Sequence, residues 1–516
     1  MNIITKKSGT EKTFIGISGG TFFQNSEIFS HNRPTEWGRI SVSGGHSGTN
    51  GYRQHQQSDS ANASLAGTID ISNTMTLDLN VAFVKTDMQF PGSLTTEQFD
   101  DDPSKVNPSS FALGGFEYYI TGGAAWTWTP EAGFSILAPL SYKWRNVQTD
   151  SSYYYYENKQ NNIEFRPQIF KTINFGNGMS LRPLAGVDLY YAGLDITSYT
   201  DQTRTDKLSL YNVGELTLAP YFTLRFDPIK SLSLSAGVRE DIAFINIDQN
   251  MDQGEPVSSS DKKDYSAFIE EVGITFNPID IFKIYAKYSS LFRYPFTDEL
   301  TKYTMEGMKF NKDLKPEEGF NVEGGIGLYF GIAELNANLF YMKLNNEIVY
   351  NEALYLNENL DATERLGTNI NLTAHILEYA DINAAYSFVK ANFADGDNKD
   401  KIIPLVPEHT FYASVMAKIP ALGISFGPDF NFRSSFYRGG DTANALDQID
   451  GYFLLGAKAR FALKKDGKEY SIQLTMRNLT DTKYATQVYY SSYSGTAYYP
   501  DADMGRSLNL TLQFRY

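Results

Sequence analysis

Clusters of tyrosine are the residues of this sequence best suited to binding a ligand. One run follows an expected strand, and further tyrosines gather in the polar segment before the last strand. Rigid aromatic rings offer stacking area at little cost in conformational entropy. We therefore expect them to contact a small molecule, although the same rings would suit an aromatic girdle at a membrane surface. The candidates are Tyr153, Tyr154, Tyr155, Tyr156, Tyr489, Tyr490, Tyr493, Tyr498 and Tyr499.

Few residues are arranged for catalysis or for holding a metal ion. The sequence has no cysteine, and its five histidines are spread widely, without a His-Glu-x-x-His spacing. Neither a Gly-x-Ser-x-Gly elbow nor a phosphate loop is present. The Asp-rich segment 395–400 lacks the spacing and the distal Glu of an EF-hand. We therefore expect a binding or transport protein rather than an enzyme, with no catalytic residue, no cofactor and no bound metal.

Alternation of polar and apolar residues predicts that β-strands position these side chains. The last ten residues, 507–516, place Leu508, Leu510 and Leu512 with two aromatics on one face, because successive side chains of a strand point to opposite faces. Similar alternation recurs along the chain, for example in 282–288. No run approaches the roughly 18 apolar residues of a transmembrane helix. A soluble propeller would show a repeat of about 40–50 residues, and none is found.

The pattern therefore predicts an all-β fold: a transmembrane antiparallel β-barrel with lipid outside and water or a plug inside. Its connections alternate between short and long, as short periplasmic turns and long extracellular loops do in outer-membrane barrels. Counting strands between these connections gives about 22, a size whose lumen is wide enough to need a plug. Tight turns are expected at 73–74, 176–178, 277–280 and 466–468, and long polar loops at 87–112, 246–264, 295–313, 351–363, 394–408, 437–449 and 488–504.

Composition agrees with this class and limits the partners. Hydrophobic residues make up 42% of the chain, which suits a barrel because only every second residue of a strand meets lipid. The 35 Tyr and 35 Phe are available for membrane-surface positions. The net charge is −15 and no basic run stands out, so we expect no nucleic-acid partner.

Arginines within the alternating segments are expected to face the lumen. An arginine that faces lipid costs about 2–4 kcal/mol at mid-membrane. The simplest role for an inward arginine is an ion pair with a plug or with a carboxylate across the barrel, and contact with a ligand is the alternative. The candidates are Arg145, Arg166, Arg182 and Arg225.

Short strings spread in order along the chain resemble the TonB-dependent receptors, the energised outer-membrane transporters of Gram-negative bacteria. They are found at 2–7, 51–53, 91–95, 292–300, 314–325, 478–484 and 505–507. The second to last of these, Asn478 to Tyr484, resembles the family's Asn-Leu-x-Asp-x-x-Tyr block. The signature positions of the family are Phe292, Arg293, Pro295, Leu314, Pro316, Glu317 and the terminal aromatic Tyr516. Arg293 lies at the outer end of an expected strand, where we expect it to stabilise the structure rather than to contact a ligand.

The resemblance implies a function and a set of partners. Segments 91–95 and 292–300 are most similar to ferric-siderophore receptors, so the implied cargo is a ferric siderophore or a similar chelate, imported with energy from TonB-ExbB-ExbD. Outer-membrane lipid, lipopolysaccharide and the barrel-assembly machinery are the other implied partners, and the outer membrane the implied location. Cobalamin, glycan and haem receptors share much of the barrel and remain alternatives. His31 or His409 would serve a haem receptor, although neither lies in a supporting motif.

The amino-terminal end departs from the family pattern. Residues 1–7 resemble only the last strand of a plug domain, and residues 8–516 account for the barrel. We expect a chain truncated within the plug. If the plug were genuinely missing, TonB coupling would be lost, and a passive open pore would be the alternative function.

Overall fold

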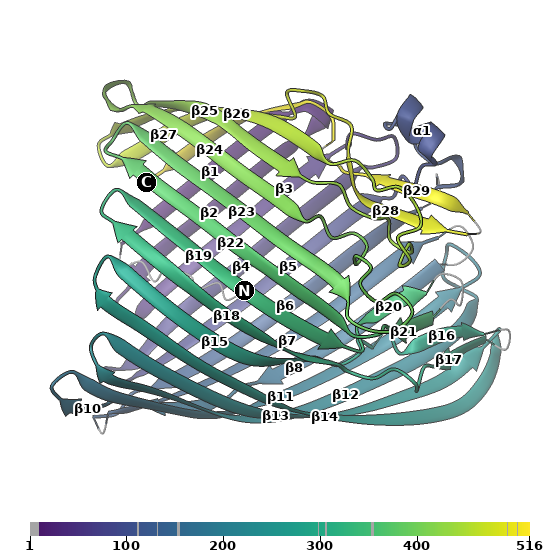
Figure 1. Ribbon diagram of the computed structural model, residues 1–516, viewed down its shortest axis with the longest axis horizontal. Coiled ribbons are helices and arrows are strands. Elements are labelled where there is room, and N and C mark those ends of the chain that lie inside the picture. The colour runs from purple at the N-terminus through teal and green to yellow at the C-terminus, as the bar shows by residue number, and fades with distance from the viewer. Residues whose placement is uncertain are drawn as a thin grey trace.

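The structure is a computed structural model in which a single tilted sheet closes into a barrel (Figure 1). It describes residues 10–110, 113–131, 133–151, 155–297, 299–304, 307–351, 356–492, 494–502 and 504–516, with the backbone alone for 301–304 and 307–309. The segment 1–7, expected as the end of a plug, lies outside the described residues.

The barrel wall consists of long antiparallel strands, and shorter elements lie in its connections. The wall strands are β1 (Lys12–Gly20), β2 (Asn25–Thr35), β3 (Gly38–Thr49), β4 (Ser58–Ser72), β5 (Met75–Gln89), β6 (Gly114–Trp128), β7 (Phe134–Asp150), β8 (Tyr155–Phe165), β9 (Gln168–Lys171), β10 (Ile173–Gly176), β11 (Met179–Tyr199), β12 (Lys207–Ile229), β13 (Leu232–Asp252), β14 (Glu255–Ile279), β15 (Phe282–Arg293), β18 (Glu317–Phe330), β19 (Ala333–Asn345), β22 (Thr363–Ile376), β23 (Ala380–Phe393), β24 (His409–Ile419), β25 (Ile424–Arg433), β26 (Tyr452–Lys465), β27 (Lys468–Arg477) and β30 (Ser507–Arg515). The connections hold β16 (Thr301–Thr304), β17 (Gly307–Phe310), β20 (Ile348–Asn351), β21 (Leu356–Asn359), β28 (Ala485–Ser491), β29 (Gly495–Pro500), the helix α1 (Thr96–Asp101) and 3₁₀ turns at Thr21–Phe23, Pro108–Ser110 and Pro420–Leu422.

The wall closes on itself and contains 22 strands. Its sheet has 24 strand segments, but β8, β9 and β10 follow one another along the same neighbour, β11, and together form one interrupted strand. The first and last strands pair, with Ile17 opposite Leu512, and this pairing removes the free sheet edges. The predicted antiparallel barrel of about 22 strands is confirmed.

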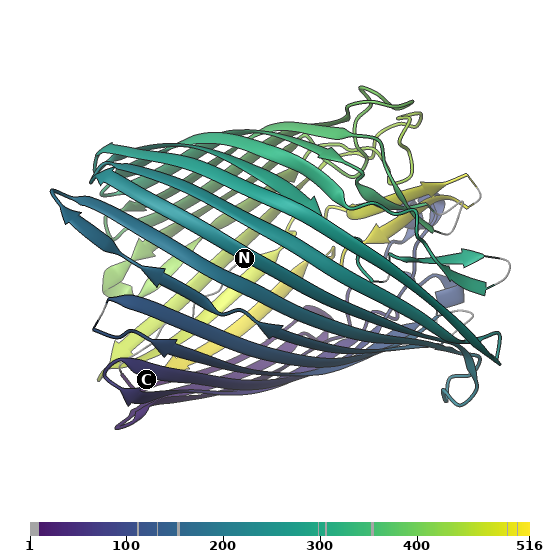
Figure 2. The same ribbon diagram turned by 90° about the horizontal axis from the view of Figure 1, so that it is seen from below.

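Short turns gather at one end of the barrel and long connections at the other (Figures 1 and 2). The tight turns expected at 73–74, 176–178 and 466–468 are present, and the one expected at 277–280 lies slightly later, at 280–281. The long loop expected at 246–264 is wrong: β13 and β14 continue through this segment and join in the two-residue turn Gln253-Gly254. We call the end that carries the long connections the outer mouth, and the opposite end, where β30 finishes, the turn end.

The strands β11 to β14 are 21 to 25 residues long and extend toward the outer mouth beyond their neighbours. Along the turn-end part of β13, Leu234 and Val238 point outward, and Phe244 is the last exposed apolar residue. Beyond it the pattern reverses: Ile245 and Ile247 are buried inside, while the residues between them are polar and face outward. The polarity of 246–264 therefore comes from an outer face in water, not from a loop.

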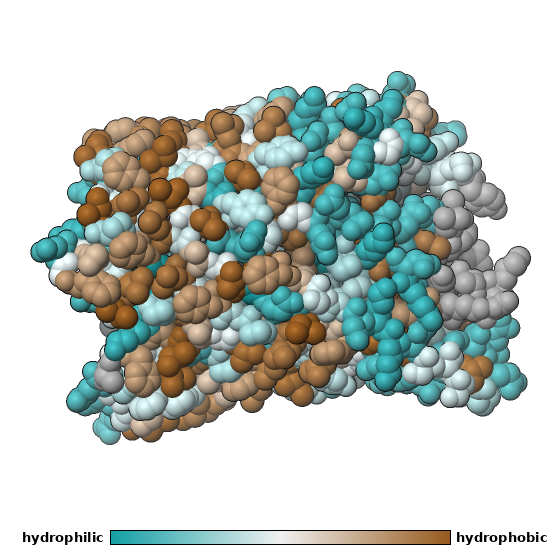
Figure 3. Space-filling view, turned by 60° about the horizontal axis from the view of Figure 1, so that its bottom comes forward, coloured by the Kyte–Doolittle hydropathy of each residue, from teal (hydrophilic) through white to brown (hydrophobic). Residues whose placement is uncertain are grey.

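The outer surface of the barrel carries an apolar band (Figure 3). Aromatic rings mark its borders: Trp126 and Trp128 stack at 6.0 Å near the turn end, and Tyr118 meets Trp144 at 5.1 Å toward the outer mouth. Tyr118 and Trp128 lie ten residues apart on β6, or roughly 33 Å along a strand, and a tilt of about 40° reduces this distance to about 25 Å. This height matches the lipid-facing band of outer-membrane barrels.

Helical structure is minor. None of the helices in the described part of the chain is long and apolar enough to cross a membrane.

Candidate functional site: the outer mouth and the lumen

All four candidate arginines lie near carboxylates of their own or a neighbouring strand. The Arg145 Nε donates to Glu117 Oε1 at 2.7 Å, and the Arg166 Nη2 lies 2.7 Å from Glu164 Oε2. Arg225 and Arg182 both approach Asp227, at 2.9 and 3.9 Å. Their partners are therefore wall residues close in the register, and none lies across the barrel.

Two further arginines, which the sequence analysis did not select, belong to the same inner surface. Arg239 on β13 bonds Asp188 and Asp241, and lies over the Tyr221 ring at 5.8 Å. Arg39 on β3 donates to Thr68. The alternation that selected Arg225 would have found both, because Arg239 follows the outward-facing Val238 and Arg39 precedes Ile40, which shares a face with the exposed Val42.

The outer connections pack on one another and form a folded rim. A buried hydrophobic cluster joins Phe436 and Ile449 with Val488 and Tyr498, and Phe99 of α1 and Leu405 pack against it. The Lys483 Nζ donates to the carbonyl of Asp100 at 2.7 Å. Connections that lie far apart in the sequence therefore support one another.

The tyrosine candidates fall into different environments. Tyr498 is only 9% exposed and its ring stacks on Phe99 at 4.5 Å, so it belongs to the hydrophobic core of the rim. Its neighbour Tyr499 is 42% exposed and meets the Tyr489 ring edge-on at 6.0 Å. Tyr155, Tyr156 and Tyr490 are half-buried. The candidates Tyr153, Tyr154 and Tyr493 lie outside the described residues.

The strings at 51–53 and 91–95 meet through one buried side chain. Arg53 is 3% exposed and donates to the carbonyls of Gly92 at 2.6 Å, Lys105 at 2.9 Å and Pro91 at 3.3 Å. Burial lowers the pKa of the guanidinium to about 10, so it stays charged at neutral pH. Gly92 has a φ of 68°, a left-handed conformation that favours glycine. The connection 90–113 is thus folded around Arg53.

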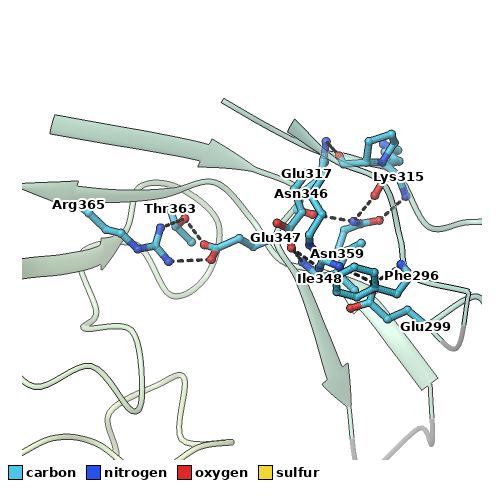
Figure 4. Close-up of polar contacts among 12 residues, drawn as sticks. Phe296, Glu299, Lys315, Glu317, Asn346, Glu347, Ile348, Asn359, Thr363 and Arg365 are labelled. Carbon is cyan, nitrogen blue, oxygen red and sulfur yellow. Dashed lines mark hydrogen bonds and ion pairs between the residues drawn. The ribbon is translucent and has the colours of Figure 1, made fainter. Parts of the chain in front are cut away.

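The signature block 292–317 closes the base of another connection (Figure 4). The Arg293 guanidinium donates to Glu299 at 2.7 Å and to Glu317 at 2.6 Å. Glu317, followed by Glu299, raises the pKa of Arg293. Pro295 and Leu314 are buried, and Leu314 joins the apolar cluster inside the long strands, with Ile245 and Tyr265.

The last signature position, Tyr516, lies at the turn end, where it exchanges backbone hydrogen bonds with Thr13 of the first strand.

Connections 294–316 and 346–362 are joined to each other by amide side chains (Figure 4). Asn359 accepts a hydrogen bond from the Lys315 N–H at 2.9 Å and donates to the Lys315 carbonyl at 3.0 Å. The Glu317 carboxylate accepts from the Ile348 N–H at 2.9 Å, and β16 pairs with β21. Asn359 therefore bonds both backbone groups of Lys315, as a neighbouring strand would.

No group of three or more His, Cys, Asp or Glu side chains within the described ranges is placed to hold a metal ion. The molecule has a charged lumen and a rim of packed connections, in which the ring of Tyr499 is exposed. These features suit recognition and passage of a ligand.

The fold and this mouth define a receptor barrel of the outer-membrane type. The chain belongs to the TonB-dependent receptor-like β-barrel family, whose model matches residues 15–479. The predicted antiparallel β-barrel and the resemblance to TonB-dependent receptors are both confirmed.

The individual relatives found by sequence have low identity to this chain and are considerably longer than it. The ferric-pyoverdine 358 receptor of Pseudomonas putida is 25% identical over 259 residues, which cover 47% of this chain and 28% of that protein. The ferric-pyoverdine BN7/BN8 receptor of the same organism is 24% identical over 283 residues, which cover 54% and 32%. The match thus spans about a third of the length of these relatives.

Solved structures show the same fold at low identity. The ferric-catecholate import receptor Fiu from E. coli K12 has a TM-score of 0.81 at 15% identity, covering 99% of this chain and 82% of that one. The siderophore receptor PiuA from Acinetobacter baumannii has a TM-score of 0.82 at 14% identity, with 99% and 82% covered.

Proposed function

We propose that this chain is the barrel of a bacterial outer-membrane receptor that binds a ferric siderophore at its outer mouth and imports it through the lumen. The observation that carries the proposal is the folded rim: the connections β5–β6, β23–β24, β25–β26 and β27–β30 share one hydrophobic cluster at a single end of a closed, charged lumen. The family, together with the siderophore receptors to which this chain is similar, supports this choice of cargo.

Energy for import is part of the same proposal. We propose that TonB-ExbB-ExbD drives passage through a plug domain whose end is represented by residues 1–7. Lipopolysaccharide and outer-membrane lipid would surround the apolar band, and the barrel-assembly machinery would insert the chain through its last strand. The exposed ring of Tyr499 and the half-buried Tyr155, Tyr156 and Tyr490 are the aromatic groups we propose for contact with the chelate.

Uptake of radioactive iron tests the cargo. The intact gene is expressed in a strain that lacks its own siderophore receptors, and uptake of iron is measured with hydroxamate, catecholate and carboxylate chelates. We expect saturable uptake of one class, lost when the proton gradient is collapsed. Uptake of cobalamin, haem or a glycan instead, with no iron chelate accepted, would refute the siderophore assignment.

The DNA sequence upstream of the Met1 codon tests the energy source. An in-frame plug, a TonB-binding motif and a signal peptide would support coupling to TonB. A stop codon there would remove this part of the proposal, and planar-bilayer conductance would then test a passive pore.

A further inference from the structure

A polar cavity lies on the outside of the barrel wall, just above the border of the apolar band. It has a volume of about 380 Å³, within the usual range for small-ligand sites. Phe116 of β6 lines it and lies two residues nearer the outer mouth than Tyr118, whose ring marks the border. Residues two apart in a strand share a face, so Phe116 points outward like Tyr118. The cavity therefore faces the surroundings of the barrel, and its composition is independent of whatever fills the lumen.

Two carboxylates face each other in this cavity. Asp59 of β4 and Asp87 of β5 are direct register partners, and like charges in such positions repel. Each carboxylate has a basic neighbour, since the His46 Nε2 lies 2.8 Å from the Oδ2 of Asp59. The Lys85 Nζ lies 3.2 Å from the Oδ2 of Asp87. Within the described part of the chain no donor occupies the Oδ1 atom of either carboxylate, so both atoms are available to accept hydrogen bonds from a ligand.

Two amide side chains extend the same face toward the outer mouth. Gln57 and Gln89 line the cavity, each two residues beyond one of the carboxylates. The Gln89 N–H donates to the Gln57 carbonyl at 2.8 Å, which continues the pairing of β4 with β5. Both side chains are exposed, and among the described residues neither amide group has a hydrogen-bond partner. A glutamine amide both donates and accepts, so the four side chains together offer donors as well as acceptors.

An aromatic ring and an ion pair complete the lining of the cavity. The Arg204 Nη2 donates to the Asp150 Oδ1 at 2.6 Å, and this pair joins the connection after β11 to the end of β7. Gly114, which shares a face with Phe116, has no side chain to fill the space beside the ring. All three carboxylates of the lining thus have a basic partner. This composition favours a neutral polar ligand over a metal ion or a phosphate.

We propose that this cavity binds a saccharide, the sugar part of a glycolipid that lies beside the barrel in the outer leaflet. A sugar carries neighbouring hydroxyl groups, each a donor and an acceptor, and an apolar C–H face that fits onto an aromatic ring. Asp59 and Asp87 accept from neighbouring hydroxyls, and the two glutamine amides donate to sugar oxygens. The ring of Phe116 lies under the C–H face.

The position of the cavity identifies the source of the sugar. A glycolipid held in the membrane presents its sugar just above the lipid border, which is where Phe116 lies relative to Tyr118. The inference rests on the proposed outer-membrane location, and it gives the proposed contact with lipopolysaccharide a defined site.

Lipopolysaccharide with its core oligosaccharide and lipid A without it are the probes, and thermophoresis of the fluorescently labelled 516-residue chain in detergent is the assay. We expect the probe that carries sugar to bind more tightly than lipid A. The double variant Gln57→Ala, Gln89→Ala should weaken binding of this probe roughly thirtyfold, the equivalent of two hydrogen bonds of about 1 kcal/mol each, and leave lipid A binding unchanged. Asn246→Ala is the matched control, because that amide is exposed on the outer face of β13 and does not line the cavity. Heat-modifiable mobility on gels checks that each variant is a folded barrel.

Salt and a chelator separate a sugar site from a charged one. Hydroxyl groups carry no net charge, so the difference between the two probes should persist at high salt and in EDTA. Loss of the difference in EDTA would mean that a divalent cation joins the carboxylates to lipid phosphates, and would overturn the proposal. Equal binding of both probes, or full sugar-dependent binding by the folded double variant, would overturn it as well. If the free core oligosaccharide bound as tightly as the whole glycolipid, the membrane source of the sugar would be refuted.

Iron uptake keeps this inference separate from the import function. The double variant should import the chelate as the native chain does, because the cavity lies outside the lumen. If the sugar-dependent difference is found but no chelate is imported, the import function fails while the site stands. If the chelate is imported and both probes bind equally, only this inference fails.

Discussion

Replacing Arg53 by alanine should open the connection 90–113 and leave the barrel intact. The side chain is almost fully buried and bonds the carbonyls of Pro91, Gly92 and Lys105. A buried acceptor left without a partner costs about 1–3 kcal/mol. The Pro91 carbonyl still accepts from the Asn107 N–H at 2.9 Å, so the variant leaves two carbonyls, those of Gly92 and Lys105, without this partner. Taking the lower value for two carbonyls gives a local destabilisation of about 2 kcal/mol, or a roughly thirtyfold more open connection.

Hydrogen exchange followed by mass spectrometry measures this opening. Peptides from 90–113 should exchange about thirtyfold faster in Arg53→Ala, while wall peptides from β11 to β14 keep their protection. Arg53→Lys should be intermediate, because one ammonium cannot reach all three carbonyls. Arg506→Ala is the control, since that side chain is 63% exposed and its ion pair within the described part of the chain is with Asp481, at 3.2 Å. Unchanged exchange in Arg53→Ala would refute the reasoning.

Three more perturbations test the mouth. Asn359→Ala should release connection 294–316, seen as faster hydrogen exchange there, because both bonds to Lys315 are lost; unchanged exchange would contradict this. Tyr498→Ala should cost about 3 kcal/mol of local stability and admit protease to the rim, whereas the exposed Tyr499→Ala should not. The Thr203 hydroxyl and backbone N–H groups lower the pKa of Asp201 from its ordinary value, so its stabilising bonds are present above the ordinary pKa and lost as pH falls through the lowered one. Pepsin cleavage of the connection after β11 should therefore rise more steeply with acid in the native chain than in Asp201→Asn, and the variant accounts for the pH dependence of the protease itself.

The sequence alone predicts an inward position for the lumenal arginines. An arginine that faces lipid is costly, and which face it occupies depends only on the alternation within its own strand. Arg225 belongs to the inward set of β12, and its distance from lipid follows from alternation alone. Its partner did not follow, since Asp227 also serves Arg182, a residue of another strand. That the two arginines lie near the same carboxylate becomes apparent only when the register is known.

The rim resists sequence-based prediction for a different reason. Tyr498 and Tyr499 are adjacent and chemically identical, yet one is buried and the other exposed. The choice depends on Phe99, which lies almost four hundred residues away in the chain. Arg53 and Asn359 likewise bond backbone carbonyls of distant connections. Every residue has a backbone carbonyl, so the residue types at those positions do not reveal such partners.

The polarity pattern of segment 246–264 reveals where two strands leave the membrane. Inside the membrane, apolar side chains must face outward and polar ones inward; above it, the outer face meets water and the inner face can hold a core. The side on which apolar residues stand therefore reverses where a strand leaves the lipid, as it does between Phe244 and Ile245. A loop has no such ordered reversal. The reversal marks the membrane border and identifies β13 and β14 as strands that continue beyond it, which gives connection 294–316 an apolar wall against which Leu300 and Leu314 pack.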